Sequence, residues 1–156
     1  MCAASLLFAC SHWPTAIPTW PDQALDDAVS PAQLSVPGHL KLLRVDGRDL
    51  PDYLMQSTSF HYQLLPGERQ LLVRHDSLWA LALGEGGERV QSEPVAMTVT
   101  LEEGGRYSLA TPSEPRSLRQ ARAMARCGEV RLMGPDGTLL HSKGAECKAG
   151  ISASGD

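Results

Sequence analysis

The sequence lacks several patterns that would define a class of function on their own. There is no excess of positive charge, because 14 Lys and Arg stand against 18 Asp and Glu, which gives a formal net charge of -4. Nucleic-acid-binding domains usually carry a basic patch on a basic domain, so the composition argues against that class. No apolar run reaches the roughly 20 residues that a transmembrane helix needs. There is also no internal repeat.

Catalytic and metal-binding spacings are missing as well. No pair of histidines has H-x-x-x-H spacing and no cysteines form C-x-x-C, so no metal site is predicted. No serine lies in a G-x-S-x-G elbow. His75, Asp76 and Ser77 are residue types of a hydrolase triad, but neighbours along a strand point to opposite faces. We therefore predict a protein that is not an enzyme, needs no cofactor and takes no small-molecule substrate.

What is present is typical of one globular β-rich domain. The chain has 156 residues, of which 42% are hydrophobic and 21% charged, within the ordinary range for a folded domain with a real core. Its 11 prolines and 14 glycines are distributed along the chain and do not form a repeat, which favours short strands separated by many turns.

The stretch from Leu40 to Arg74 contains the clearest strand and turn signals. It reads L-K-L-L-R-V-D-G-R, a polar spacer, and then L-L-P-G-E-R-Q-L-L-V-R. Asp46-Gly47 and Pro66-Gly67 supply the backbone freedom of tight turns between residues that favour strands. We interpret these four turn residues as framework positions that set strand register, and the strand edges beside them as the first place to look for a binding surface.

Alternation and capping signals predict the other elements. Phe60, Tyr62 and Leu64 alternate with polar residues, and Pro66-Gly67 predicts that this strand forms a hairpin with the one from Gln70. A second hairpin is predicted from 95–101 and 106–110, a short helix after Ser117 in an S-x-x-Q capping box, and a last hairpin over 129–141. Together these patterns predict a mainly β, antiparallel β-sandwich-like single domain with one short helix.

The N-terminal segment suggests export. Leu7-Phe8-Ala9-Cys10 resembles a bacterial lipobox, in which the thiol of Cys10 would be acylated, for example with palmitate. No Lys or Arg precedes Lys41, which departs from the usual signal sequence; one explanation is that the true start lies upstream of Met1. The alternative is an apolar terminus with an incidental cysteine. We expect four segments: signal sequence and lipobox (1–10), Pro-rich tether (11–31), β domain (32–147) and disordered tail (148–156).

Cys127 and Cys147 flank the last predicted hairpin. In an oxidising compartment they would pair and close a loop that contributes on the order of 3 kcal/mol in the chain-entropy model. Cys2 would be removed with the signal sequence and Cys10 would be acylated, so Cys127 and Cys147 would be the two thiols left to pair. The disulfide and the export signal are therefore consistent with each other.

Several motifs resemble those of a known bacterial family. They are L-S-V-P at 34–37, L-L-R-V-D-G-R at 42–48, L-P-G-E-R-Q-L-L-V-R at 65–74, S-E-P at 92–94, and an Ala- and Arg-rich segment before a strand that ends in D-G at 136–137. In order and spacing they resemble the periplasmic family of the curli assembly protein CsgI, also called YccT. The resemblance covers roughly 32–140 and implies an exported protein, with one family member thought to restrain polymerisation of the curli subunit.

The sequence and the resemblance lead to one expected function and one alternative. We expect a non-catalytic lipoprotein domain of the cell envelope, anchored by lipid to the outer membrane on its periplasmic side. It would bind an envelope or secreted protein, by strand addition at an exposed edge, and would modulate the assembly of extracellular, curli-like fibres. The alternative is an accessory lipoprotein that binds cell-wall or surface polysaccharide.

Overall fold

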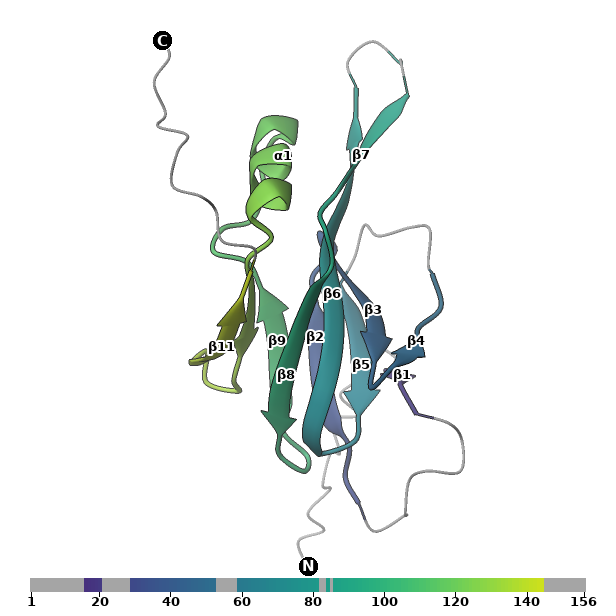
Figure 1. Cartoon of the computed structure of the whole chain (residues 1–156), viewed down its shortest axis with the longest axis vertical. Helices are drawn as coiled ribbons and strands as arrows, with labels where there is room; N and C mark the ends of the chain where they lie inside the picture. The colour runs from purple at the N-terminus through teal and green to yellow at the C-terminus, as the bar shows by residue number, and fades with distance from the viewer. Residues whose placement is uncertain (1–15, 21–28, 53–58, 82–83, 85, 145–156) are drawn as a thin grey trace, which may run out of the picture.

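The computed structural model describes residues 16–20, 29–52, 59–81, 84 and 86–144 as two packed β-sheets with one short helix (Figure 1). The first sheet has the order β1-β5-β2-β9-β10-β11, and the second has the order β4-β3-β6-β7, with β8 also paired to β6. The predicted fold class, mainly β with two sheets and a single short helix, is confirmed. The strands of the first sheet are β1 (Ile17–Pro18), β2 (Ala32–Val36), β5 (Phe60–Leu64), β9 (Arg106–Ala110), β10 (Val130–Met133) and β11 (Leu139–Lys143). Those of the second are β3 (Leu40–Val45), β4 (Arg48–Asp49), β6 (Gly67–Ala80), β7 (Gly87–Gln91) and β8 (Val95–Leu101).

The hydrophobic core lies between the two sheets. Each contributing strand buries alternate residues, as in β8, whose pattern of buried and exposed positions has a period of two. The most deeply buried side chains come from both sheets and include Leu34, Leu64, Leu132, Leu40, Leu42 and Val73. The alternation in the sequence therefore places one face of each sheet in the core, which is why two layers form.

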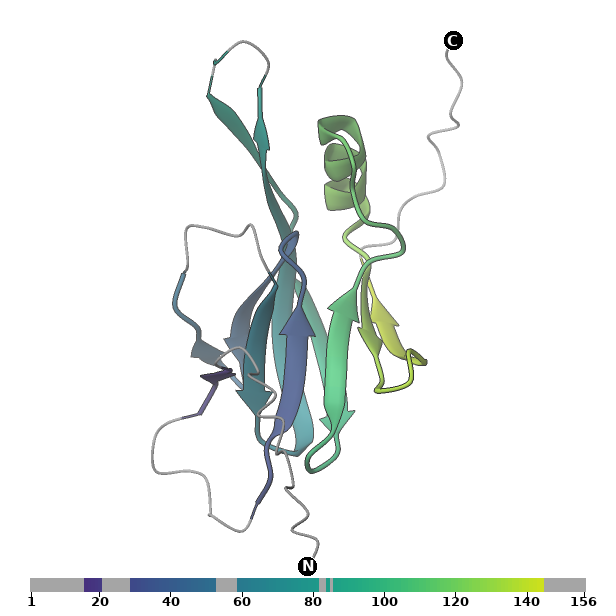
Figure 2. The ribbon, with the colours of Figure 1, turned by 180° about the vertical axis from the view of Figure 1, so that it is seen from behind.

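The longest strand, β6, organises the second sheet. Its first part pairs with β3 on one side and β8 on the other, and its last part, from Asp76 to Ala80, pairs with β7. Between β7 and β8, residues 92–94 lie opposite only Arg74 and His75 of β6, so the chain carries an extra residue there and forms a β-bulge. Beyond β3, the end of β6 and β7 form a hairpin that extends past the rest of the second sheet (Figures 1 and 2).

Two predicted hairpins are wrong. β5 does not pair with β6, because β5 lies between β1 and β2 in the first sheet while β6 lies in the second. β8 likewise pairs with β6, whereas β9 pairs with β2 and β10. The turns at Pro66-Gly67 and Gly104-Gly105 do not join neighbouring strands but carry the chain from one sheet to the other. The last predicted hairpin, β10 with β11, is confirmed.

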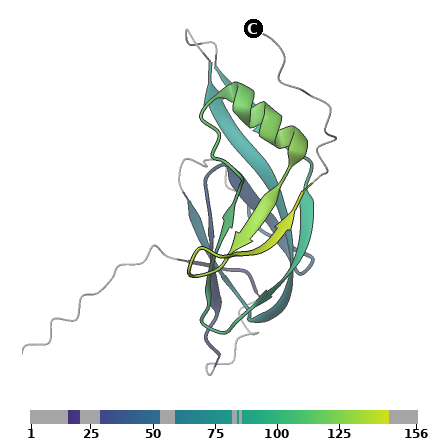
Figure 3. The same cartoon turned by 90° about the vertical axis from the view of Figure 1, so that its left-hand side faces the viewer.

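The helix α1 (Leu118–Cys127) has the predicted start and end signals. The Ser117 side chain accepts a hydrogen bond from the Gln120 N–H, and Gly128 ends the helix with a φ of 60°, a left-handed conformation that suits glycine. Figure 3 shows α1 beside the hairpin of β6 and β7, and a bidentate pair between Arg122 and Glu88 of β7 joins the two. The helix therefore supports one face of the hairpin.

Part of the predicted tether belongs to the first sheet. Ile17 and Pro18 form β1 and pair in parallel with Tyr62 and Gln63 of β5, and the Thr19 hydroxyl donates to the Gln63 carbonyl. The proposed signal sequence (1–10) and tail (148–156) lie outside the described residues.

Candidate functional site

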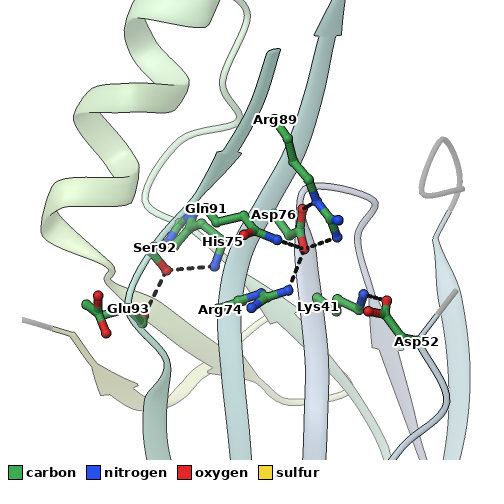
Figure 4. Close-up of polar contacts among 9 residues, drawn as sticks. All are labelled: Lys41, Asp52, Arg74, His75, Asp76, Arg89, Gln91, Ser92 and Glu93. Carbon is green, nitrogen blue, oxygen red and sulfur yellow. Dashed lines mark hydrogen bonds and ion pairs between the residues drawn. The ribbon is translucent and has the colours of Figure 1, made fainter. Parts of the chain in front are cut away.

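A buried carboxylate, Asp76, lies where β6 leaves β3 and continues into the hairpin. Its side chain accepts four hydrogen bonds: two from Arg89, at 2.8 Å each, one from Arg74 at 3.1 Å and one from Gln91 at 3.0 Å (Figure 4). We call these residues, with the neighbouring Lys41, the Asp76 cluster. Because Asp76 is only 4% exposed, it depends on these donors for the solvation that water would otherwise supply.

The cluster keeps Asp76 ionised. Burial favours the neutral acid, but the hydrogen bonds from Arg89 and Gln91 and the charges of Arg89 and Arg74 outweigh it and hold the pKa of Asp76 below its ordinary value. The same contacts raise the pKa of Arg89. A carboxylate with both oxygens engaged and a lowered pKa is a poor proton donor or acceptor, so its chemistry suits a structural role at the base of the hairpin.

Lys41 is the buried cation of the cluster. Lys41 is only 4% exposed, and its ammonium group pairs with the exposed carboxylate of Asp52. Burial lowers the pKa of Lys41, the charge of Asp76 opposes this, and the charges of Arg89 and Arg74 add to it. The charge of Lys41 is thus compensated by the carboxylate of Asp52 and, at longer range, by that of Asp76.

The residue types of a hydrolase triad on β6 have separate partners. Asp76 binds the arginines of its cluster, His75 lies 3.3 Å from the Glu129 carbonyl through Nε2, and the Ser77 hydroxyl accepts from the Trp79 indole. Among the residues that the structure describes, no group of three or more His, Cys, Asp or Glu side chains is arranged to hold a metal ion.

Two histidines, His39 and His75, lie where the sheets meet below the hairpin. His39 Nε2 is 2.9 Å from the Thr111 hydroxyl, which itself donates to the Ser113 carbonyl, so the His39 Nε2–H is the donor. Burial lowers the pKa of both imidazoles. At His39, the negative charge of Glu114 raises the pKa and so opposes the effect of burial. At His75, the hydrogen bond to the Glu129 carbonyl raises the pKa, whereas the charge of His39 lowers it further.

This histidine pair predicts a loss of stability in mild acid. Since the folded pKa values lie below the unfolded value of about 6.5, the unfolded chain binds more protons, and the free energy of unfolding should fall as pH drops through that value. Urea unfolding at pH 7.5 and 5.5 measures the slope. The His39→Gln/His75→Gln double variant should flatten it, while His61→Gln serves as a histidine control outside the pair; an unchanged slope in the double variant would contradict this assignment.

The predicted turn residues lie near the same end of the contact between β3 and β6, where Val45 pairs with Leu71. Asp46 and Gly47, both with positive φ, form the turn between β3 and β4. The Asp46 carboxylate accepts from the Gln70 N–H and pairs with Arg69, which fixes the turn to β6. Pro66 and Gly67 lie at the start of β6, and Gly67 also has positive φ.

Of the predicted covalent sites, Cys127 alone lies within the described residues. Cys127 is the last residue of α1 and is disulfide-bonded, while Cys147 and Cys10 lie outside the described residues. Pairing of Cys127 with Cys147 and acylation of Cys10 therefore stay predictions.

The Asp76 cluster was not predicted from the sequence. The pattern in the sequence is Arg74 and Asp76, two residues apart on β6, followed by Arg89 and Gln91, two residues apart on β7. All four side chains lie on the same face of the hairpin. That pattern becomes visible only when the register of β6 and β7 is known, and β7 itself was not predicted.

The fold and the saturated charge cluster define a mainly β, two-sheet domain with a supported hairpin. The chain belongs to a family described as an uncharacterized protein conserved in bacteria (DUF2057), whose family model matches residues 33–154. No curated protein and no solved structure matches the chain. Within the described residues, no helix has both the length and the apolar character needed to cross a bilayer.

Proposed function

We propose that this chain is a non-catalytic protein-binding domain of the bacterial cell envelope. The observation that carries the proposal is the hairpin of β6 and β7, which extends beyond the second sheet and bears Leu78, an apolar side chain that is 71% exposed (Figure 1). A hairpin with an unpaired strand edge can be extended by a strand of another protein, and the Leu78 side chain adds an apolar contact there. The support comes from α1 on one side and the Asp76 cluster at the base.

We further propose membership of the periplasmic family of the curli assembly protein CsgI and, with it, a role in modulating extracellular fibre assembly. The shared motifs coincide with structural junctions: L-L-R-V-D-G-R spans β3, its turn and β4, and L-P-G-E-R-Q-L-L-V-R enters β6. These motifs support a common fold, and the functional step follows by analogy.

Crosslinking from intact cells tests the binding function. A tagged full-length chain is crosslinked, purified under denaturing conditions and analysed by mass spectrometry. We expect recovery of a specific envelope or secreted protein that is absent from an unrelated envelope lipoprotein prepared in parallel. Recovery of peptidoglycan or surface-polysaccharide fragments without a protein would reject this function in favour of the glycan-binding alternative.

The proposed lipid anchor makes a separate prediction. Cys10→Ala should move the protein from the membrane fraction to the soluble fraction and abolish incorporation of labelled palmitate, because the acylated thiol is removed. Cys2→Ala is the matched control and should change neither result. An unmodified mature chain that begins at Met1, identified by mass spectrometry, would contradict the anchor.

A further inference from the structure

We infer that the free edge of β6 at Leu78 and Ala80 is a docking site for an extended segment of another polypeptide. This inference rests on the proposed protein-binding function and gives it a location and a type of partner. It depends on three observations: the direction of the backbone groups at this edge, the groove beside it, and the exposed side chain of Leu78.

The direction of the backbone groups follows from the hydrogen bonds along β6. The His75 carbonyl accepts from the Ser92 N–H, and the Leu81 N–H donates to the Gly86 carbonyl, so odd-numbered residues face β7 and β8. The Asp76 N–H donates to the His39 carbonyl on the opposite side, toward β3. Because this direction alternates along an antiparallel strand, the N–H and C=O groups of Leu78 and Ala80 point toward the side of β3.

No described strand pairs with that side of the hairpin. The pairing of β3 with β6 stops at Leu40 opposite His75, and in the described part of the chain no hydrogen bond is made to the outward groups of Leu78 or Ala80. Such a row of unpaired donors and acceptors is a template for another strand. A partner strand here would continue the line of β3.

A groove of about 450 Å³ runs beside this edge. Its lining includes Pro37, His39, Glu114 and Pro115, and β6 contributes Ser77, Leu78 and Trp79. The groove therefore offers backbone partners together with contacts to both polar and apolar side chains. Strand addition typically uses this combination, with main-chain bonds for affinity and side-chain contacts for specificity.

These lining residues favour a single extended segment over a second copy of the chain. Pairing of two copies through this edge would bring a second set of these lining residues, including Pro37 and Pro115, toward the same groove. A lone segment brings no such second set. Opposite Leu78 we expect an apolar or β-branched residue, because directly opposed apolar pairs stabilise a sheet, and we expect no proline where the segment must donate.

The test uses a random-peptide phage library panned against the immobilised full-length chain. We expect enrichment of apolar, β-branched and proline-free peptides. Binding of the synthesised peptides, measured by fluorescence anisotropy, should weaken by about tenfold in Ala80→Pro, which removes one outward donor and adds a ring at the edge. Leu78→Lys, which keeps the backbone N–H but places a charge at the edge, should also weaken binding.

Thr98→Pro is the matched control. Thr98 lies on β8, and its N–H points away from β6, so the change removes an outward donor from a different edge. Thermal unfolding of every variant checks that it is folded. Equal peptide binding by the wild type and Ala80→Pro, no enrichment of peptides, or dimerisation through this edge in light scattering would each overturn the inference. If instead peptides bind as expected but cells yield only glycan, the proposed envelope function fails and the docking site stands.

Discussion

Asp76→Asn is expected to destabilise the domain by about 3 kcal/mol, a typical cost of removing one partner from a buried ion pair. The amide has nearly the same shape as the carboxylate but loses the negative charge. It also presents an N–H₂ group to donors from Arg89, Arg74 and Gln91, where an acceptor is needed. The free energy from urea unfolding at pH 7 measures the effect.

The exposed pair between Glu88 and Arg122 provides the control for this experiment. Glu88→Gln removes a carboxylate from the same hairpin, but exposed ion pairs contribute little to stability, so little change is expected. The pH dependence gives a second check. Because the folded pKa of Asp76 is lowered, its stabilisation is present above about pH 4 and is lost as the pH falls through the folded value, whereas Asp76→Asn should lack this component. Equal stability of Asp76→Asn and wild type would contradict the proposed role of the cluster.

Local signals predict the elements of the fold more accurately than their partners. The alternation in β8 and the caps of α1 depend on nearest neighbours and on burial, both of which can be read from a short window. Asp46-Gly47 predicts a turn because Asp and Gly tolerate positive φ, which is a property of the residues themselves. Both residues have positive φ in the structure.

Pairing is not local, and this is where prediction from the sequence fails. Pro66-Gly67 and Gly104-Gly105 contain the residues of tight turns, yet each turn joins strands in different sheets. The parallel contact between β2 and β9 joins Leu34 to Tyr107, which are far apart in the sequence, and no pattern around either residue specifies it. Burial of both sheets against one core selects these pairings, and that selection involves the whole chain.

The same reasoning explains why the candidate surfaces are only partly predictable. The expectation that strand edges are the binding surface comes from the stretch 40–74, whereas the free edge lies further along β6, at Leu78 and Ala80. β7 begins at Gly87, in a glycine-rich stretch whose composition is typical of an exposed loop. Because β7 was not predicted, the hairpin of β6 and β7 was not predicted either. The unpaired edge of β6 and the Asp76 cluster at the base of the hairpin therefore could not be identified from the sequence.

Cys127→Ser is expected to lower the free energy of unfolding by about 3 kcal/mol, because loss of the disulfide removes a loop closure from the unfolded chain. If Cys147 is the partner, Cys147→Ser and the double variant should have the same effect as the single variant. Reduction of the wild type should also have this effect and add nothing to the double variant. Thiol titration and peptide mapping of the unreduced protein identify the pair, and two free thiols or a different partner would contradict it.

The position of Cys127 also predicts where reduction acts. Cys127 ends α1, the helix contacts β7, and Arg122 pairs with Glu88 on the hairpin. Loosening the end of the helix should therefore raise hydrogen exchange at the amides of β7 more than at those of β3, which is held to β6 by strand pairing and by Asp46. Uniform changes across both strands would show that the disulfide stabilises the domain as a whole and does not support the hairpin through α1.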